Sequence, residues 1–576
     1  MESPVSITGM GIICAIGNDV PSVLESLRNR RSGIRAMEYL QSVHSDIPVG
    51  EVAMSDLELK ELLGIRTEEP VSRNSMLGAV AIREALASAG AGDLSNKRVA
   101  LVSGTTVGVM DVTEKYYERM KTDPSLQYLP HSNECGRSTL EMASFALIPQ
   151  AKCCTVSTAC SSALNSIMIG TEMLLRDEAD IVIAGGAESL SKFHLNGFNT
   201  LMILDRERCR PFDDTRSGLN LGEGAAFVVL EKNASESRTL SYVRGYANKC
   251  DAFHQTASSE NGEGAYLAMT EALEMASLSP GDIQYVNAHG TGTPNNDLSE
   301  SRALQRVFGD NMPEVSSTKA FTGHTTSASG SIETVICILA MQHGFTPPSL
   351  GCERPIPGGI VPTKGRDGVV LDNVLCNAFG FGGNDSSLII SRFRYPLEDG
   401  CQGAPHKVKV VAREKVDSVE DLSSLREFIS PIESRRMGKL MKAGHLSAIR
   451  ALKAAGTDCP DAIVSATSRG MLEVSTAFLE EIVTNGEEHL KPTLFMQSTH
   501  NTIGSALAIR TRCHGYNITY SHGDESLAWA LWDAERLVSS GKARTVLVEA
   551  CDETLNGTST ESFCAEGIVL AVDDQS

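Results

Sequence analysis

The sequence predicts an α/β protein built from more than one domain. Short runs of β-prone residues that end in glycine alternate with runs of helical periodicity, and the alternation resumes after Pro280. A chain of 576 residues also exceeds the size that one hydrophobic core usually supports. Alternating strands and helices pack in layers, so we expect helix-covered sheets in at least two units.

The predicted elements divide the first part of the chain into two α/β halves, residues 1–250 and 251–395. The periodicities predict strands at 99–104, 181–186, 283–288 and 373–378 and helices at 163–176, 297–308 and 328–342. Apolar periodicity then lapses at 396–406, where Gly and Pro cluster. We expect a linker there.

Residues 407–576 repeat the order of the first half. Three segments are echoed in sequence order: Arg73–Leu86 by Arg436–Leu452, Ala100–Gly108 by Ala462–Gly470, and Asp180–Glu188 by Thr545–Glu553. Ordered self-similarity of this kind indicates an internal duplication. We therefore predict a degenerate repeat of the N-terminal half.

Composition restricts the classes of function. No stretch approaches the 18 or so apolar residues of a membrane span, and the N-terminus lacks a basic leader followed by an apolar segment, so we expect a cytoplasmic protein. The 15 cysteines contain no Cys-x-x-Cys pair, which favours reduced thiols. A net charge of -21 repels phosphates, which argues against nucleic acid and anionic membrane as partners.

Cys160 is the first candidate for a catalytic residue. It follows the β-prone run Thr155–Ser157 and directly precedes a helical segment, so its sulfur should lie near a helix N-terminus. The dipole and the free N–H groups of a first helical turn stabilise negative charge there and lower a thiol pKa. This placement predicts a thiolate suited to acyl transfer.

Two histidines complete the candidate site. His289 follows a predicted strand and is followed by a glycine turn, and His324 precedes a predicted helix. Lys319 and the glycine-rich turn Phe379–Asn384 lie in the same half. Strand ends and loops deliver side chains to sites, so the combination favours a shared active site with Cys160.

Five motifs together resemble those of the elongating β-ketoacyl-acyl carrier protein synthases, which use a Cys-His-His set. They occur in that family's order and at about its spacing over residues 1–395: Thr158–Ser162, His289–Thr293, Ser317–Lys319, Gly323–Thr325 and Asn377–Asn384. Arg210–Asp213 and Gly222–Ala225 also resemble the stretch that this family carries between the cysteine and the first histidine.

This resemblance implies a thiolase-like five-layer αβαβα fold, a homodimer, and no metal or organic cofactor. The implied partners are acyl-loaded and malonyl-loaded acyl carrier protein, with a separate chain-length partner left open. The implied reaction condenses an acyl group held on Cys160 with a malonyl thioester and releases carbon dioxide. It serves fatty acid, polyketide or polyene synthesis.

The resemblance also assigns roles. His289 and His324 would donate hydrogen bonds to the developing enolate, and backbone N–H groups of Cys160 and Phe381 would form an oxyanion hole. Lys319 would orient His324, with Glu333 paired to it. Phe381, beside Phe379, resembles the phenylalanine that gates the acyl pocket. The segment Leu129–Ala143 departs from the expected pattern and should help to shape that pocket.

The repeat resembles divergent, chain-length-factor-like ketosynthase halves. Aligned on the following helix, its Ser521–Ser526 places Gly523 at the position of Cys160, so the nucleophile is missing. We expect this half-copy (residues 407–576) to dock on the synthase as a built-in pseudo-subunit with a packing or pocket-shaping role.

Three alternatives stay open on the sequence. A CoA-dependent thiolase would need a second cysteine in the late glycine-rich loop, where this chain has Phe379–Gly383. A non-catalytic chain-length partner is disfavoured by Cys160. A scaffold that only binds acyl carrier protein would take no acyl group from it.

Overall fold

The computed structural model describes residues 4–126, 128–130, 133–395 and 406–573. The predicted linker at 396–406 lies almost wholly outside the described residues. The first half contains these elements: β1 (Val5–Cys14), α1 (Val20–Arg28), α2 (Asp56–Leu63), α3 (Arg73–Ala89), β2 (Val99–Gly104), α4 (Met110–Met120), α5 (Cys135–Phe145), β3 (Lys152–Val156), α6 (Ser162–Leu175), β4 (Ile181–Glu188), α7 (Lys192–Thr200) and β5 (Gly224–Lys232).

The second half and the half-copy follow the same α/β pattern. β6 (Ser241–Cys250) ends the first half. The second half contains α8 (Glu263–Ala276), β7 (Tyr285–Asn287), α9 (Pro294–Phe308), β8 (Glu314–Ser316), α10 (Lys319–Thr322), α11 (Ser329–His343), β9 (Phe345–Thr346), β10 (Arg366–Asp367), β11 (Asn373–Gly380) and β12 (Asn384–Ser391). The half-copy contains β13 (Val408–Val416), α12 (Val419–Leu422), α13 (Pro431–Ser434), α14 (Lys439–Ala454), β14 (Ala462–Ala466), α15 (Leu472–Asn485), α16 (Pro492–Met496), α17 (Thr502–Thr511), β15 (Tyr516–Tyr520), α18 (Ser526–Ser539), β16 (Thr545–Asn556) and β17 (Ser559–Val572).

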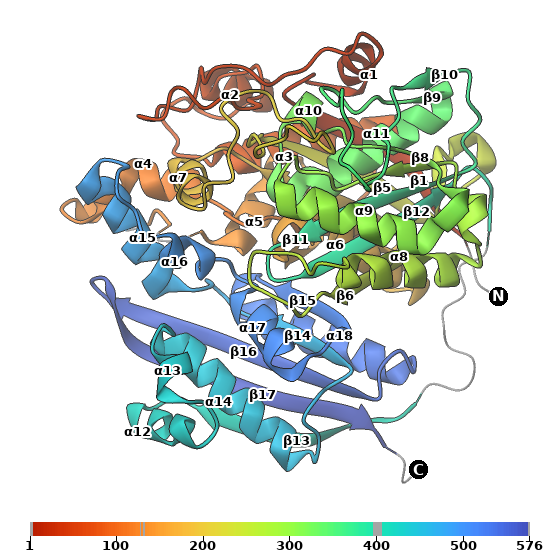
Figure 1. Ribbon diagram of the computed structural model, residues 1–576. Helices are drawn as coiled ribbons and strands as arrows, with labels where there is room; N and C mark the ends of the chain where they lie inside the picture. The colour runs from red at the N-terminus through yellow and green to blue at the C-terminus, as the bar shows by residue number, and fades with distance from the viewer. Residues whose placement is uncertain (1–3, 127, 131–132, 396–405, 574–576) are drawn as a thin grey trace.

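One hydrogen-bonded sheet of 15 strands runs through all three parts. Its order is β13-β17-β16-β14-β15-β3-β2-β4-β5-β1-β6-β12-β11-β7-β8. The half-copy's β15-β14-β16-β17-β13 reproduces the first half's β3-β2-β4-β5-β1, including which neighbours are parallel. This match confirms the predicted repeat, and the half-copy is the lower, blue part of the molecule in Figure 1.

The core explains the layering. Helices α6 and α11 contact each other and are buried along nearly their whole length, because apolar or small residues lie on all their faces. They form the middle layer of a thiolase-like fold, as predicted. In the half-copy the counterpart of α6 is α18, which has an exposed side at Ala528 and Glu535 because no second half covers it.

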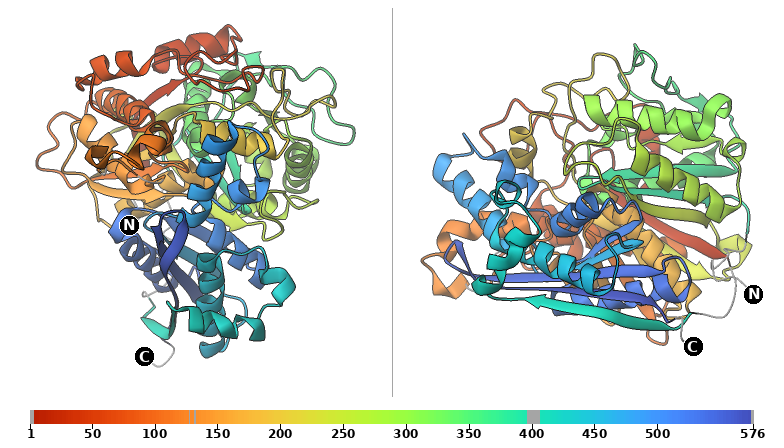
Figure 2. Two further views of the ribbon diagram at one scale, coloured as in Figure 1. Left: turned by 90° about the vertical axis from the view of Figure 1, so that its left-hand side faces the viewer. Right: turned by 60° about the horizontal axis from the view of Figure 1, so that its bottom comes forward.

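The half-copy docks by pairing β15 with β3. Val156 and Tyr520 lie opposite each other in antiparallel register. The backbone N–H of Ser157 donates to the Thr519 carbonyl at 2.9 Å, and that of Ser521 donates to the Thr155 carbonyl at 3.0 Å. Corresponding residues of the two copies thus exchange corresponding bonds about a local pseudo-twofold axis, as in an isologous interface. Figure 2 shows the two bodies in contact from two further directions.

A buried ion pair fixes the same junction. Arg536 of α18 contacts Glu172 of α6 at 2.9 Å, and both side chains are at most 5% exposed. These residues occupy the same position, the eleventh, of two 14-residue helices. Burial alone would raise the pKa of Glu172, but Arg536 and Lys542 outweigh it and lower the pKa to about 2.

This pairing bears on the predicted homodimer, which a single chain does not test. The β3 edge is already taken by β15. Two identical first halves joined across this axis would also bring Glu172 against a second Glu172, and like charges in a buried contact repel. A homodimer of this chain would have to use another face.

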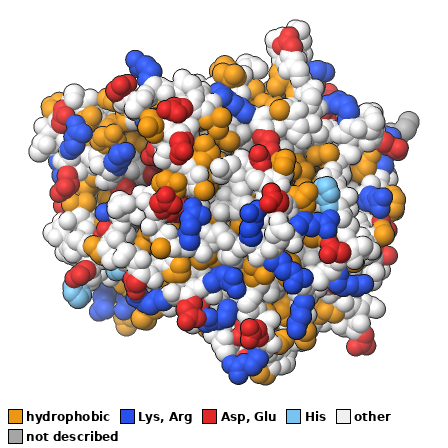
Figure 3. Space-filling model, turned by 90° about the horizontal axis from the view of Figure 1, so that it is seen from above, with side chains coloured by type: hydrophobic (Ala, Val, Ile, Leu, Met, Phe, Trp, Pro, Cys, Tyr) orange, Lys and Arg blue, Asp and Glu red, His pale blue; other side chains and the backbone are white. Residues whose placement is uncertain are grey.

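On the face shown in Figure 3, acidic, basic and hydrophobic side chains are intermixed, and neither sign of charge dominates. No helix within the described ranges is long and apolar enough to cross a membrane. The 14 cysteines among the described residues are free thiols.

Candidate active site

Cys160 lies in a tight turn at the end of β3. It is the middle residue of a single 3-10 turn, Ala159–Ser161, which leads directly into α6. Ala159 has a φ of 52°, a left-handed conformation that is costly for a residue with a Cβ and that often marks functional sites. The turn directs the cysteine toward the second half while α6 remains in the core.

The predicted thiolate is wrong for the ligand-free protein. Burial raises the pKa of the Cys160 thiol to about 12, although Lys319 and the backbone of Phe381 act in the opposite direction. Desolvation therefore outweighs the helix terminus on which the sequence prediction relied. Cys160 needs a base that takes its proton during attack.

His324 lies where such a base is needed. Its Nε2 is 3.2 Å from the Cys160 sulfur, and its Nδ1 is 3.0 Å from the Ser329 hydroxyl at the start of α11. Burial and the charge of Lys319 keep the pKa of His324 well below its usual range, so the imidazole is neutral. A neutral ring with Nδ1–H bonded to Ser329 leaves Nε2 free to accept the thiol proton.

His289 completes the cluster from β7. Its ring lies 5.2 Å from that of His324, at 81°. Burial and Lys319 lower its pKa as well, so both rings are neutral, as the proposed donation to an enolate requires. Glu300 of α9 accepts hydrogen bonds from the backbone N–H groups of His289 and Gly290, at 2.8 and 2.7 Å. This carboxylate fixes the loop that presents His289.

Lys319 and Glu333 form a buried pair beside the histidines. Their Nζ and Oε1 atoms are 2.5 Å apart, and both side chains are at most 3% exposed. Burial raises the pKa of Glu333 to about 7, against the pull of Lys319. The lysine charge lowers the pKa of both histidines, so it tunes the site, and the orienting of His324 by Lys319 stays a prediction.

The glycine-rich loop between β11 and β12 closes the site from above the sulfur. A Cβ on Gly380 would come within 3.1 Å of the Cys160 backbone nitrogen, so the loop needs glycine there to approach. The backbone of Phe381 lies close enough to the Cys160 sulfur to oppose the rise in its pKa. Gly380 thus brings the backbone before Phe381 next to that of Cys160, and the oxyanion hole formed by the N–H groups of Cys160 and Phe381 stays a prediction.

Phe379 and Phe381 take different positions. The ring of Phe379 packs 5.8 Å from that of His289. Phe381 stacks on Phe198 at 5.6 Å and 21° and lines a cavity of about 30 Å³ beside Cys160. The gating role of Phe381 stays a prediction, and the glycine-rich turn that carries this residue is called the gate loop below.

The half-copy lines the same cavity. Phe495, Ser498 and Thr499 face it from the end of α16 and the residues that follow. The Phe495 ring lies against Gly197 in α7, where any Cβ would come within 2.1 Å of the ring. Glycine inside a helix costs about 1 kcal/mol relative to alanine, and here it makes room for an aromatic ring of the other copy. The two copies are therefore fitted to each other at the acyl pocket.

The half-copy also holds the gate loop. Asn501 Nδ2 donates to the Phe381 carbonyl at 2.9 Å, and Asn384 Nδ2 donates to the Ser505 hydroxyl at 3.2 Å. Sequence reasoning missed Ser329, Glu300, Asn501 and Phe495. The first two follow their histidines at short distances along the chain, but nothing in the sequence signals a contact from residue 501 to residue 381.

The predicted alignment of Gly523 with Cys160 is wrong by one residue. The 3-10 turn Gly523–Glu525 matches Ala159–Ser161, and Gly523 has the positive φ (57°) of Ala159. Ser526 bonds back to His522 and Gly523 as Ser162 bonds back to Thr158 and Ala159. Asp524 therefore takes the place of Cys160. It is exposed and offers no thiol, so the predicted loss of the nucleophile stands.

Among the described residues, one group of side chains has the donor atoms and spacing to hold a metal ion. The ligand atoms of Cys160, His289 and His324 lie within 4.8 Å of one another, a donor set that suits Zn²⁺. The expectation of no metal and no organic cofactor stays a prediction.

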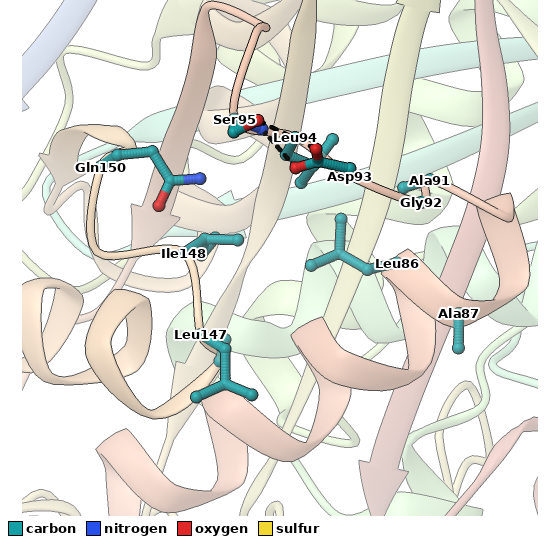
Figure 4. A pocket seen from close by; sticks show the side chains of 11 residues that line it. Leu86, Ala87, Ala91, Gly92, Asp93, Leu94, Ser95, Leu147, Ile148 and Gln150 are labelled. Atoms are coloured by element: carbon teal, nitrogen blue, oxygen red, sulfur yellow. Dashed lines mark hydrogen bonds between the residues drawn. The ribbon is translucent and has the colours of Figure 1, made fainter.

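A second hollow lies on the surface, away from the candidate site (Figure 4). It has a volume of about 680 Å³ and is lined by Leu86, Leu147 and Ile148, with the Ser95 backbone N–H donating to Asp93. It shares no lining residue with the Cys160 cavity.

Comparison with known proteins identifies the family. Residues 2–236 match the beta-ketoacyl synthase N-terminal domain, residues 240–353 match its C-terminal domain, and residues 411–571 match a second profile of the N-terminal domain. The 3-oxoacyl-[acyl-carrier-protein] synthase 2 of Coxiella burnetii is 31% identical over 409 residues, covering 67% of this chain and 98% of that protein. The chain belongs to the β-ketoacyl synthase family.

Further relatives agree with this assignment. Nodulation protein E of Rhizobium meliloti is 32% identical over 419 residues, covering 67% of this chain and 99% of that protein. The ishigamide ketosynthase/chain length factor is 29% identical with a TM-score of 0.63, covering 68% of this chain and 100% of that one. A PfaC keto synthase-chain length factor shares the fold over 100% of this chain and 79% of its own, with a TM-score of 0.78 at 16% identity.

Proposed function

We propose that this ketosynthase is a β-ketoacyl-[acyl-carrier-protein] synthase in which Cys160 carries the acyl group. The observation that carries the proposal is the contact between His324 Nε2 and the Cys160 sulfur, with His289 beside it. Its relatives include 3-oxoacyl-[acyl-carrier-protein] synthases, which supports carrier-bound thioesters as substrates. We further propose domains at 1–250, 251–395 and 407–576 and a cytoplasmic location.

The first half-reaction loads the enzyme. The Cys160 thiol passes its proton to His324 Nε2 as sulfur attacks the acyl thioester carbonyl. The tetrahedral oxyanion accepts hydrogen bonds from the N–H groups of Cys160 and Phe381. Collapse expels the carrier thiolate, which takes the proton back from His324. The acyl group then lies in the cavity behind Phe381.

The second half-reaction forms the carbon–carbon bond. Loss of carbon dioxide from malonyl-carrier protein leaves an enolate, whose oxygen accepts hydrogen bonds from His289 and from His324. For this step the neutral His324 ring carries its proton on Nε2, and the Ser329 hydroxyl donates to Nδ1. The enolate carbon attacks the Cys160 thioester carbonyl, the carbon–sulfur bond breaks, and the Cys160 thiolate takes a proton from solvent. Neutral histidines suit this step because each can donate without adding a charge to a dry pocket.

The half-copy acts as a resident pseudo-subunit that shapes the acyl pocket. Phe495 closes part of the cavity, and Asn501 holds the gate loop. Asp524 in place of the nucleophile leaves one acylation site in each chain.

Intact-mass analysis tests the proposed function. Wild-type protein and Cys160→Ala are incubated with a panel of acyl-carrier proteins and then with malonyl-carrier protein. We expect a wild-type acyl adduct that is absent in the variant and that malonyl-carrier protein discharges as a β-ketoacyl product. A folded wild-type protein that takes no acyl group from any donor would overturn the proposal in favour of a binding role.

A further inference from the structure

The residues that line the cavity beside Cys160 are of two chemical kinds. Phe193, Phe198, Phe381 and Phe495 contribute phenyl rings. Asn133, His194 and Thr106 contribute polar groups and are called the polar wall below. A pocket that held only a saturated alkyl chain would not need buried amide and imidazole groups, because such groups cost free energy when they lack partners.

Asn133 has a fixed orientation and an unused acceptor. Its Nδ2 donates to the Thr106 carbonyl at 3.3 Å, so a flipped amide would place two oxygens against each other. Its Oδ1 is buried and has no hydrogen-bond partner among the described residues, and the side chain is only 2% exposed. A buried acceptor without a donor is rare in folded proteins and calls for an explanation.

His194 adds to the same wall a second polar side chain that can make a further hydrogen bond. Its Nε2 lies 3.5 Å from the Thr106 hydroxyl, which gives its own proton to Glu188 and can therefore only accept. Burial lowers the pKa of His194, so the ring is neutral and has one donor and one acceptor nitrogen. The ring packs edge-on against Phe198 at 6.1 Å, which keeps it at the cavity.

The other polar groups of the cavity are already satisfied. Thr326 donates to Glu188 at 3.1 Å, Ser498 donates to the Phe495 carbonyl at 2.8 Å, and Thr499 bonds to Thr502 at 3.0 Å. Asn133 Oδ1 therefore still needs a hydrogen-bond donor. A hydroxyl supplies that donor and can also accept a hydrogen bond, whereas a ketone cannot donate.

From this wall we infer that the acyl group carried on Cys160 bears a hydroxyl near its thioester end, bound by Asn133 and flanked by His194. This inference rests on the proposed function and names the substrate class for the same site. The hydroxyl belongs on the first few carbons because Cys160 and both polar groups line one cavity of only about 30 Å³. A site built to bind a substrate hydroxyl discriminates strongly against the analogue that lacks it.

The test measures acyl loading of the full-length protein by intact mass, with matched carrier-bound thioesters. Butanoyl is compared with 2-hydroxybutanoyl, 3-hydroxybutanoyl, 4-hydroxybutanoyl and 3-oxobutanoyl groups. We expect one hydroxy compound to load at least about tenfold faster than butanoyl, as one satisfied buried hydrogen bond implies, and faster than the oxo compound. Asn133→Leu should lower the hydroxy-to-butanoyl loading ratio to about one, because the acceptor that distinguishes the two acyl groups is gone.

Thr499→Val is the matched control, because it alters the same cavity at a hydroxyl that is already bonded. It should keep the hydroxy-to-butanoyl ratio. Each ratio is taken within one protein, so differences in folding cancel. Equal loading of butanoyl and every hydroxy compound by wild-type protein would overturn the inference and leave the proposed function intact. Failure of every donor, butanoyl included, would instead contradict the proposed function.

Discussion

The same turn occurs twice in this molecule and has kept its backbone while losing its chemistry once. Ala159–Ser161 and Gly523–Glu525 have the same 3-10 geometry and the same serine bonding back from the next helix. Only the first carries a thiol and faces two histidines. The comparison teaches that the half-copy was retained for its fold and its contacts, while reactivity depends on the second half that it lacks.

The largest expected effect comes from removing the thiol of the first turn and placing a thiol in the second. Cys160→Ala should lower condensation by about 10⁴-fold or more, because removing the nucleophile removes the covalent route. Adding Asp524→Cys to that variant should restore nothing, since no pair of histidines among the described residues clusters with position 524 as His289 and His324 do with Cys160. The readout is β-ketoacyl product by mass spectrometry. Recovered turnover in the double variant would show that the half-copy keeps a working site.

The junction should be the next most sensitive feature. Arg536→Met leaves Glu172 buried with less compensation and should lower the free energy of unfolding by about 3–5 kcal/mol. The matched control is Lys542→Met, whose side chain is 31% exposed, contacts the same Glu172 oxygen, and should cost about 1 kcal/mol or less. Denaturant unfolding monitored at Trp529 and Trp532 of α18 compares them. Equal losses would contradict the assignment of Arg536 as the main junction contact.

Acid should loosen the half-copy through His500. Burial lowers the pKa of His500 from 6.5 to about 4, so the folded protein holds the neutral ring. The resulting stability is fully present above pH 6.5 and is lost as the pH falls toward 4, amounting to about 3 kcal/mol. His500→Gln should reduce the slope of the stability curve across that window, while buried His445, whose pKa is also lowered to about 4, keeps its own share of the slope. An unaltered slope in His500→Gln would refute the assignment.

The smallest effect is expected at the gate loop. Asn501→Ala removes one hydrogen bond to the Phe381 carbonyl, worth about 1 kcal/mol, and should change acyl loading by about fivefold. Ser498→Ala is a suitable comparison, because it alters a neighbouring hydroxyl that bonds within the half-copy. Stopped-flow loading rates separate the two. A larger effect for Ser498→Ala would place the control of loading in the cavity wall.

Sequence predicted the repeat, the elements and the candidate residues because strand and helix periodicity and short motifs are local. The placement of His324, His289 and Lys319 around Cys160 follows from the family resemblance. The pKa of Cys160 was predicted in the wrong direction because burial cannot be read from a neighbouring helix. Gly523 was aligned one residue out because the turn is defined by φ angles and by serine hydrogen bonds, which a sequence alignment does not contain.

The contacts between the two copies were not predictable for a related reason. The glycine at position 197 is explained only by its contact with the Phe495 ring, which lies nearly 300 residues further along the chain. Likewise, Glu172 and Arg536 are unremarkable charges until the pseudo-twofold axis brings them together. Long-range complementarity of this kind is visible only in the folded chain.

The most direct test of the half-copy's role is the acyl-loading profile of Phe495→Ala. If the half-copy shapes the Cys160 pocket, removing this ring should enlarge the cavity, and the longest acyl group that loads on Cys160 should increase by several carbons. A hydrophobic pocket discriminates by about 1–3 kcal/mol per methylene, so the change should appear as a graded shift. An unchanged profile in a folded Phe495→Ala protein would contradict the claim that the half-copy is part of the active site.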